Sequence, residues 1–148
     1  MIPKPFSLGT VLSFRKRQEN IAQEKFIQAK IAVKIATQEL EIAKHDLNTL
    51  IKTLEEKQNK GILAMELARF EERIHYDRIQ LQFLKNSLDD RQKTAQRRRK
   101  TLLEKAKDYK VLNTLKEQQN SAWKNYLEKK EAAMLDEIAI LRHNRKIN

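Results

Sequence analysis

The chain has 148 residues, enough for one domain and short for two, and 31 Lys and Arg against 20 Asp and Glu give it a net charge of +11. It contains two glycines, two prolines and no cysteine. A chain with so few turn-forming residues cannot reverse its direction often, which excludes β-sandwiches, β-barrels and α/β folds. The lack of cysteine excludes a disulfide framework, a thiolate zinc site and a cysteine nucleophile.

The N-terminal sequence lacks the pattern of a signal peptide, and no stretch approaches the roughly 20 apolar residues of a membrane span. These two observations predict a cytoplasmic protein. The positive charge points to an acidic partner, which can be nucleic acid, an anionic membrane surface or an acidic protein.

The first predicted helix covers about residues 7–58, with Ser7 as a candidate N-cap. Within it, ten apolar residues recur at alternating steps of four and three. Such a heptad repeat predicts a helix that buries this seam against another helix, and it argues against disorder. The seam positions are Ala22, Phe26, Ala29, Val33, Ala36, Leu40, Ala43, Leu47, Leu50 and Leu54.

A turn is predicted at about residues 59–65, where Gly61 can adopt the left-handed conformation that ends a helix. The second predicted helix covers about residues 66–142. The same apolar spacing continues there, and the phase slips near Tyr109. The seam positions of this helix are Phe70, Ile74, Leu81, Leu84 and Leu88.

An antiparallel pairing matches the two seams. If Leu54 faces Leu67, then Leu47 faces Ile74 in the same register. The predicted fold is therefore all-α: a long two-helix antiparallel coiled-coil hairpin that forms a single domain over residues 1–148. The second helix is the longer one, so about 30 residues of its C-terminal part should project beyond the first helix.

Three segments resemble the FliJ family of flagellar type III export proteins. The family's closing signature is similar to the stretch from Leu115 to Arg142, which contains the sequence LDEIA at residues 135–139. Its turn is similar to residues 61–70. Its opening motif is similar to the set Phe6, Leu8, Val11, Leu12 and Arg15. Virulence-associated homologues of the YscO type share this architecture, and the sequence does not separate the two groups.

The resemblance implies a specific role. Members of the family look like the γ-subunit stalk of rotary ATPases and act without enzymatic activity. The implied function is that of a central stalk and adaptor in flagellum biogenesis. The implied partners are the hexameric export ATPase, whose ring it helps to assemble, the cytoplasmic domain of the export gate, and export chaperones. The implied location is the cytoplasm. There the protein would lie at the inner face of the cytoplasmic membrane, to which only its partners would attach it.

Two groups of partner-binding residues are expected from this role. For Trp123, packing on the N-terminal segment and anchoring of a partner both remain open. The expected ATPase end comprises Phe6, Leu8, Leu12, Arg15, Trp123, Leu127, Leu135, Asp136, Glu137, Ile138 and Arg142. The expected export-gate end comprises Ile62, Leu63, Met65 and Leu67.

Two other functions remain as alternatives. One is a general coiled-coil scaffold or tether that dimerises through Met134, Ile138 and Leu141. The other, less favoured, is nucleic-acid binding through the basic run at residues 97–100. These four side chains point in different directions around a helix, so a solvated surface is the first interpretation of the run and an acidic protein partner the second. We expect no nucleic-acid partner.

No catalytic, cofactor or metal site is predicted. His45, His75 and His143 are too far apart in sequence to form a metal pair on one helix. Adjacent acidic residues such as Glu71 and Glu72 face different directions on a helix and cannot converge on a substrate.

Overall fold

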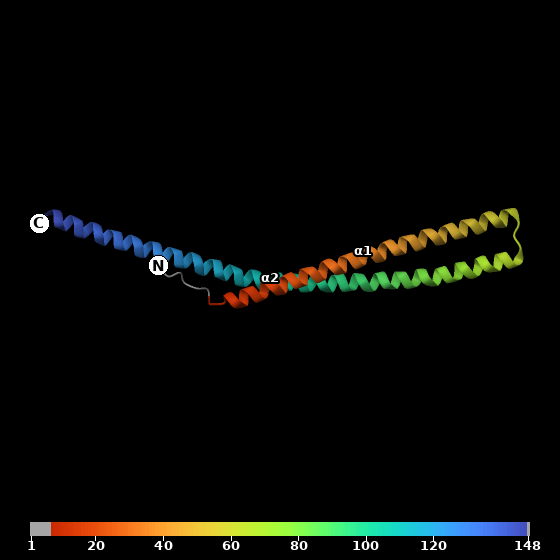
Figure 1. Cartoon of the computed structure of the whole chain (residues 1–148), viewed down its shortest axis with the longest axis horizontal. Helices are drawn as coiled ribbons and strands as arrows, with labels where there is room; N and C mark the ends of the chain where they lie inside the picture. Colours follow the sequence, from red (N-terminus) through yellow and green to blue (C-terminus); the bar gives the residue numbers. More distant parts are fainter. Residues whose placement is uncertain (1–6, 148) are drawn as a thin grey trace. The chain divides into compact units, whose positions relative to one another are not determined.

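A computed structural model describes residues 7–147, which form two long α-helices and no strand (Figure 1). Helix α1 spans Gly9–Lys60 and helix α2 spans Ala64–Ile147. The two helices pack against each other, which confirms the predicted all-α hairpin. The predicted partner residue Phe6 lies outside the described residues.

The turn between the helices is shorter than the sequence suggests. It comprises residues 61–63 in place of about 59–65. Gly61 has a φ of 97°, the left-handed conformation expected of it, and its N–H donates a hydrogen bond of 3.3 Å to the carbonyl oxygen of Gln58. The N–H of Leu67 already donates to the carbonyl oxygen of Leu63 at 3.0 Å, so helical bonding resumes directly after the glycine.

The N-terminus of α1 is capped by a different residue from the one predicted. The first bond of the helix runs from the N–H of Leu12 to the carbonyl oxygen of Leu8, at 2.9 Å. Leu8, not Ser7, therefore occupies the N-cap position. At the other end of the chain, α2 continues to Ile147, beyond the predicted end near Arg142, because no glycine or proline interrupts it.

The chain forms two compact units, each built from parts of both helices. Unit 1 combines the start of α1, up to Asn20, with α2 from Glu104 onward, and unit 2 comprises Ile21–Leu103. In unit 2 the buried side chains of Leu47, Leu54 and Ile74 form the core. Partly buried residues pack against this core, namely Leu50, Ile51, Ile62, Leu67, Phe70 and Leu81.

The heptad seam lies where the sequence places it. Every seam position predicted on the two helices is buried or half-buried, and none is exposed. The alanine positions are among the most buried, with Ala36 only 2% exposed, because a small side chain lets the partner helix approach closely. Leu47 and Ile74, paired in the predicted register, belong to the same core cluster.

Polar contacts across the hairpin follow nearly the same register. In unit 2, Lys57 Nζ lies 2.9 Å from Glu66 Oε1, and Arg91 donates a 3.2 Å hydrogen bond to the carbonyl oxygen of Ala32. In both pairs the two residue numbers add up to 123, whereas facing seam residues such as Leu54 and Leu67 add up to 121. The offset of two arises because long side chains reach past the residue directly opposite.

Candidate functional site

The C-terminal part of α2 displays a long exposed surface. Every residue from Glu128 to Ile147 is exposed. This stretch includes large apolar side chains that would be buried in an ordinary core, namely Met134, Leu135, Ile138, Ile140 and Leu141, each between 45% and 60% exposed. A concentration of exposed apolar side chains of this kind usually marks an interaction surface.

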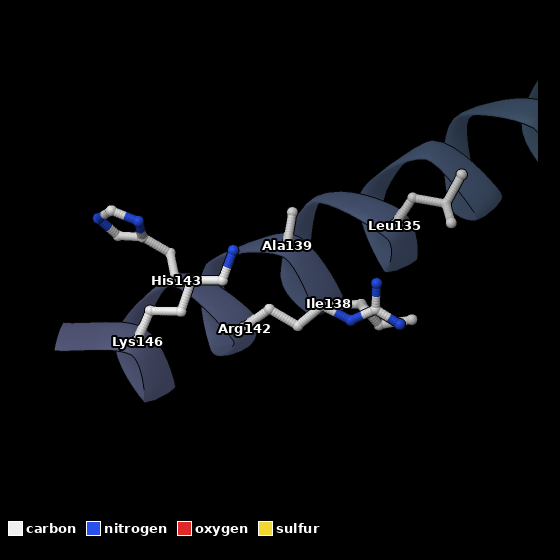
Figure 2. A pocket seen from close by; sticks show the side chains of 6 residues that line it. All are labelled: Leu135, Ile138, Ala139, Arg142, His143 and Lys146. Carbon is white, nitrogen blue, oxygen red and sulfur yellow. The ribbon is translucent and has the colours of Figure 1, made fainter. Parts of the chain in front are cut away.

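One face of this segment combines apolar and cationic groups (Figure 2). A shallow depression on α2 is lined by Leu135, Ile138, Ala139, Arg142, His143 and Lys146, which we call the C-terminal face. Their spacing of three and four residues places them on one side of the helix. In Figure 2 the apolar residues are followed along the helix by the three basic side chains.

The C-terminal face brings together only some of the predicted partner residues. Leu135, Ile138 and Arg142 line it, whereas Asp136 and Glu137 do not. The reason is geometric, because each residue turns by about 100° around the helix axis. The LDEIA segment therefore contributes apolar groups to this face and carboxylates to other sides of α2.

Two aromatic residues of α2, Trp123 and Tyr126, lie about three helical turns before the C-terminal face. The rings of Trp123 and Tyr126 stack with their centroids 5.4 Å apart and an interplanar angle of 23°. Trp123 and Leu127 are half-buried, while Tyr126 is exposed.

The predicted residues at the start of α1 are mostly engaged inside unit 1. Leu12 is buried at 8% exposure, and Arg15 donates a hydrogen bond of 3.0 Å to the carbonyl oxygen of Asp108. The ammonium of Lys16 lies 4.8 Å from the centre of the Tyr109 ring. Leu12 and Arg15 therefore hold α1 against α2, and Leu8, at 39% exposure, is the more accessible of the candidates.

The predicted residues near the turn divide in the same way. Ile62 and Leu67 pack against the core of unit 2. Leu63 and Met65 are 76% and 73% exposed, which leaves them available to a partner.

A further apolar surface in unit 2 was missed by the sequence analysis. It consists of Ile35 and Ile42 on α1 with Tyr76, Ile79 and Phe83 on α2, all between 45% and 67% exposed, and we call it the lateral face. Relative to the seam, these residues occupy the c and f heptad positions. The c positions of two antiparallel helices lie on the same side of the pair, because each borders the g edge. Large apolar residues at c were the signal that could have revealed this surface.

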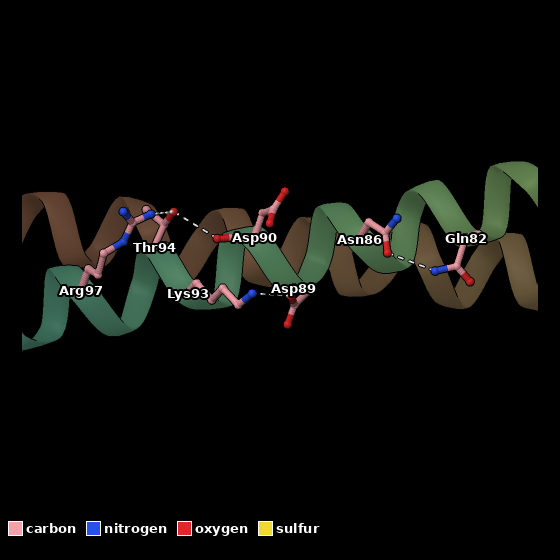
Figure 3. A network of polar contacts seen from close by, with 7 residues as sticks. All are labelled: Gln82, Asn86, Asp89, Asp90, Lys93, Thr94 and Arg97. Atoms are coloured by element: carbon pink, nitrogen blue, oxygen red, sulfur yellow. Dashed lines mark hydrogen bonds and ion pairs between the residues drawn. The ribbon is translucent and has the colours of Figure 1, made fainter.

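Helix α2 also carries a row of polar contacts that ends in basic residues (Figure 3). Lys93 lies 3.0 Å from Asp89, and the hydrogen bond with this carboxylate raises the pKa of Lys93 above its ordinary value of 10.5. Arg97 donates a 3.2 Å hydrogen bond to the hydroxyl of Thr94, which in turn donates to the carbonyl oxygen of Asp90 at 3.1 Å.

The described part of the chain offers neither a candidate metal site nor a membrane-spanning helix. Within residues 7–147, no three His, Cys, Asp or Glu side chains gather closely enough to hold a metal ion. No helix in the same range has a stretch long and apolar enough to cross a bilayer.

Comparisons with known proteins place the chain in a family. A solved structure described as a YscO homologue from Chlamydia trachomatis is similar in fold, with a TM-score of 0.53 and 17% sequence identity over 97% of this chain and 96% of that chain. None of the curated proteins compared with the chain matches it. The family model described as flagellar FliJ protein matches residues 4–148. Since that match covers nearly the whole sequence, the chain belongs to the FliJ family and is a protein associated with type III export.

Proposed function

We propose that this protein is a non-enzymatic central stalk and adaptor of a hexameric flagellar export ATPase, and that it promotes assembly of the ATPase ring. Membership of the FliJ family supports an export role. The observation that carries the ATPase assignment is the uninterrupted exposure of α2 from Glu128 to Ile147. A helix end that displays apolar and cationic side chains together is suited to insertion into a protein cavity.

The C-terminal face supplies two kinds of binding energy. Leu135 and Ile138 are 60% and 45% exposed, and burying such side chains contributes roughly 1.5–3 kcal/mol each when they start fully exposed. Arg142 and Lys146 can attract carboxylates of the partner, which favours fast association and fixes the register of docking.

The test uses one substitution at two positions of the same helix. Ile138 lines the C-terminal face. Ile140 is also exposed, but it does not line this face and points about 200° around the helix axis from Ile138. We expect Ile138→Glu to weaken binding to the export ATPase by about tenfold or more and to abolish stimulation of ATP hydrolysis. Ile140→Glu serves as the matched control and should bind like the parent.

Two results would contradict the ATPase assignment. If Ile138→Glu and Ile140→Glu bound the ATPase equally well, the C-terminal face would not be the ATPase-binding surface. Self-association of the parent that Ile138→Glu abolishes, without any binding of the ATPase, would favour a general coiled-coil tether that dimerises through this helix.

We assign the link to the export gate to unit 2. The lateral face offers five exposed large apolar residues, and Leu63 and Met65 near the turn add two more. These exposed apolar side chains are the surface of unit 2 that we propose for contact with the cytoplasmic domain of the gate.

A matched pair on α1 tests this assignment. Ile42 belongs to the lateral face, while Ile27, exposed at 48%, occupies the b heptad position on the other side of the helix. Ile42→Asp should lower affinity for the gate domain by about tenfold, and Ile27→Asp should leave it unchanged. Loss of affinity in both variants, or in neither, would show that the gate binds elsewhere.

The proposed adaptor works in the cytoplasm and also receives export chaperones. It reaches the inner face of the cytoplasmic membrane only through its partners. Cell fractionation tests this point, because the protein should sediment with membranes when the export gate is present and remain in the supernatant when the gate is deleted. Sedimentation without the gate would indicate direct contact with lipid.

A further inference from the structure

The charges of unit 2 are unevenly distributed along the hairpin. Residues 35–90, which include the turn, hold eight Lys and Arg against eleven Asp and Glu, a net charge of −3. Residues 91–103 of α2, which we call the basic band, hold six Lys and Arg and no acidic residue, a net charge of +6. More than half of the protein's net charge of +11 is therefore concentrated in thirteen residues.

Four of the six cations of the basic band are available to a partner, while Lys93 is paired with Asp89. Arg97, Arg98, Arg99 and Lys100 are all exposed, and within residues 7–147 none of the four forms an ion pair. Only Arg91 is engaged across the hairpin, through its bond to Ala32. Since no carboxylate among residues 7–147 pairs with the run at residues 97–100, the positive potential of this run extends into solvent.

Cations of the band line two shallow depressions on α2. Arg97 lines both of them, and it also donates a hydrogen bond of 3.2 Å to the hydroxyl of Thr94. One depression is also lined by Thr94, Arg98 and Thr101, and the other by Lys93, Gln96 and Lys100. Each depression therefore combines cationic side chains with neutral hydrogen-bond donors, and carboxylates accept hydrogen bonds from both kinds of group.

The arrangement of the cations favours a protein over a membrane or a nucleic acid. Residues 97–100 follow one another at about 100° around the helix axis, so they face several directions, whereas a bilayer or a duplex contacts one side of a helix. Leu103 is the single exposed large apolar residue of the band, which leaves no row of anchors for lipid. The band contains no aromatic residue on which bases could stack.

We propose that the basic band is a docking site for a carboxylate-rich protein segment that contacts α2 on more than one side. This surface is separate from the C-terminal face and the lateral face, so the proposal goes beyond the assigned ATPase and gate contacts. Arginine predominates in the run, and its planar guanidinium pairs with carboxylates through two parallel hydrogen bonds.

The experiment measures binding of the full chain to poly-L-glutamate at low ionic strength. The test variant replaces Arg97, Arg98, Arg99 and Lys100 by glutamine. The control removes the same number of charges from exposed positions of unit 2 outside the band, by glutamine at Lys52, Arg69, Arg78 and Lys85. Glutamine is a good helix former and all eight sites are exposed, so both variants should keep the helix content of the parent in circular dichroism.

We expect the test variant to bind poly-L-glutamate about tenfold more weakly than the control. The same comparison with phosphatidylserine vesicles and with duplex DNA should give nearly equal affinities for the two variants. Equal affinity of both variants for poly-L-glutamate would overturn the proposal, because binding would then depend on total charge alone. A larger difference with vesicles or with DNA would also overturn it, by assigning the band to lipid or to nucleic acid.

Discussion

The guanidinium of Arg91 donates a hydrogen bond of 3.2 Å to the carbonyl oxygen of Ala32, which lies 59 residues earlier in the chain. Arg91 occupies a d position of the α2 heptad, where a large apolar side chain would normally fill the seam. Arg91 is half-buried, so its aliphatic stem packs along the hairpin while its guanidinium donates a hydrogen bond to the backbone of α1. Arg15 makes the equivalent contact in unit 1, with the carbonyl oxygen of Asp108 at 3.0 Å.

The Arg91 contact gives a prediction with opposite signs for two substitutions. Arg91→Ala should lower the free energy of unfolding by about 1 kcal/mol, because both the hydrogen bond and the packed stem are lost. Arg91→Leu should be at least as stable as the parent, since an apolar side chain at a seam position replaces a charge that is costly to bury. Urea denaturation measures both. A leucine variant less stable than the parent would show that the hydrogen bond of Arg91 to Ala32 contributes more than an apolar side chain at this seam position.

A second prediction concerns burial in the seam. Leu40 is 6% exposed, whereas Ile42, on the same helix, is 62% exposed. Leu40→Asp should cost about 3 kcal/mol or more, because a carboxylate is buried there without a cation to pair with it. Ile42→Asp should change stability by less than about 0.5 kcal/mol, as is usual for a surface position. Similar losses for the two variants in thermal denaturation would contradict the assignment of the seam.

The fold was predictable because one strong periodic signal runs through both helices. Ten apolar positions at steps of four and three determine which side of α1 is buried, and the scarcity of glycine leaves Gly61 as the natural point of reversal. The helix ends were less predictable. Ser7 suggests an N-cap, yet the first helical hydrogen bond of α1 is accepted by the carbonyl oxygen of Leu8. The position of the cap depends on local backbone geometry, which many sequences can adopt.

The candidate surfaces were predictable only in part, for a related reason. Exposure of the end of α2 follows from the difference in helix length, so Leu135 and Ile138 could be identified. Leu12 and Arg15 belong to the same opening motif as Leu8, but a linear motif does not distinguish residues that pack from residues that bind. The lateral face was missed because single exposed apolar residues are common in soluble proteins, so the large residues at c carry a signal only when the c positions of both helices are considered together.

A third prediction follows from the ion pair on the outer side of α2. The hydrogen bond that the Lys93 ammonium donates to Asp89 raises the pKa of Lys93 above 10.5. The pair therefore stabilises the folded state below pH 10.5, and this contribution is lost as the pH rises through the elevated pKa. Asp89→Asn should bring the pKa of Lys93 back toward 10.5. Asp90→Asn is the control and should have a smaller effect, because the Asp90 carboxylate acts on Lys93 only through its charge.

The Lys93 titration can be followed by NMR at its side-chain carbon next to the amine. Equal shifts in the two variants would mean that the charge of this acidic pair, and not the hydrogen bond to Asp89, controls the amine.

The last prediction uses the two glycines of the chain, which should respond to alanine in opposite directions. A methyl group at Gly61 would meet no atom within 4 Å, so space is not limiting, but the φ of 97° is unfavourable for any residue with a side chain. Gly61→Ala should therefore destabilise the hairpin by about 1 kcal/mol through backbone strain alone. Gly9 also has open space and lies in the first turn of α1 without a positive φ. Gly9→Ala should stabilise the protein by about 0.5 kcal/mol, because alanine restricts the unfolded chain more than glycine does. Thermal denaturation of both variants provides the comparison, and a stabilising Gly61→Ala would show that the turn does not need the left-handed conformation.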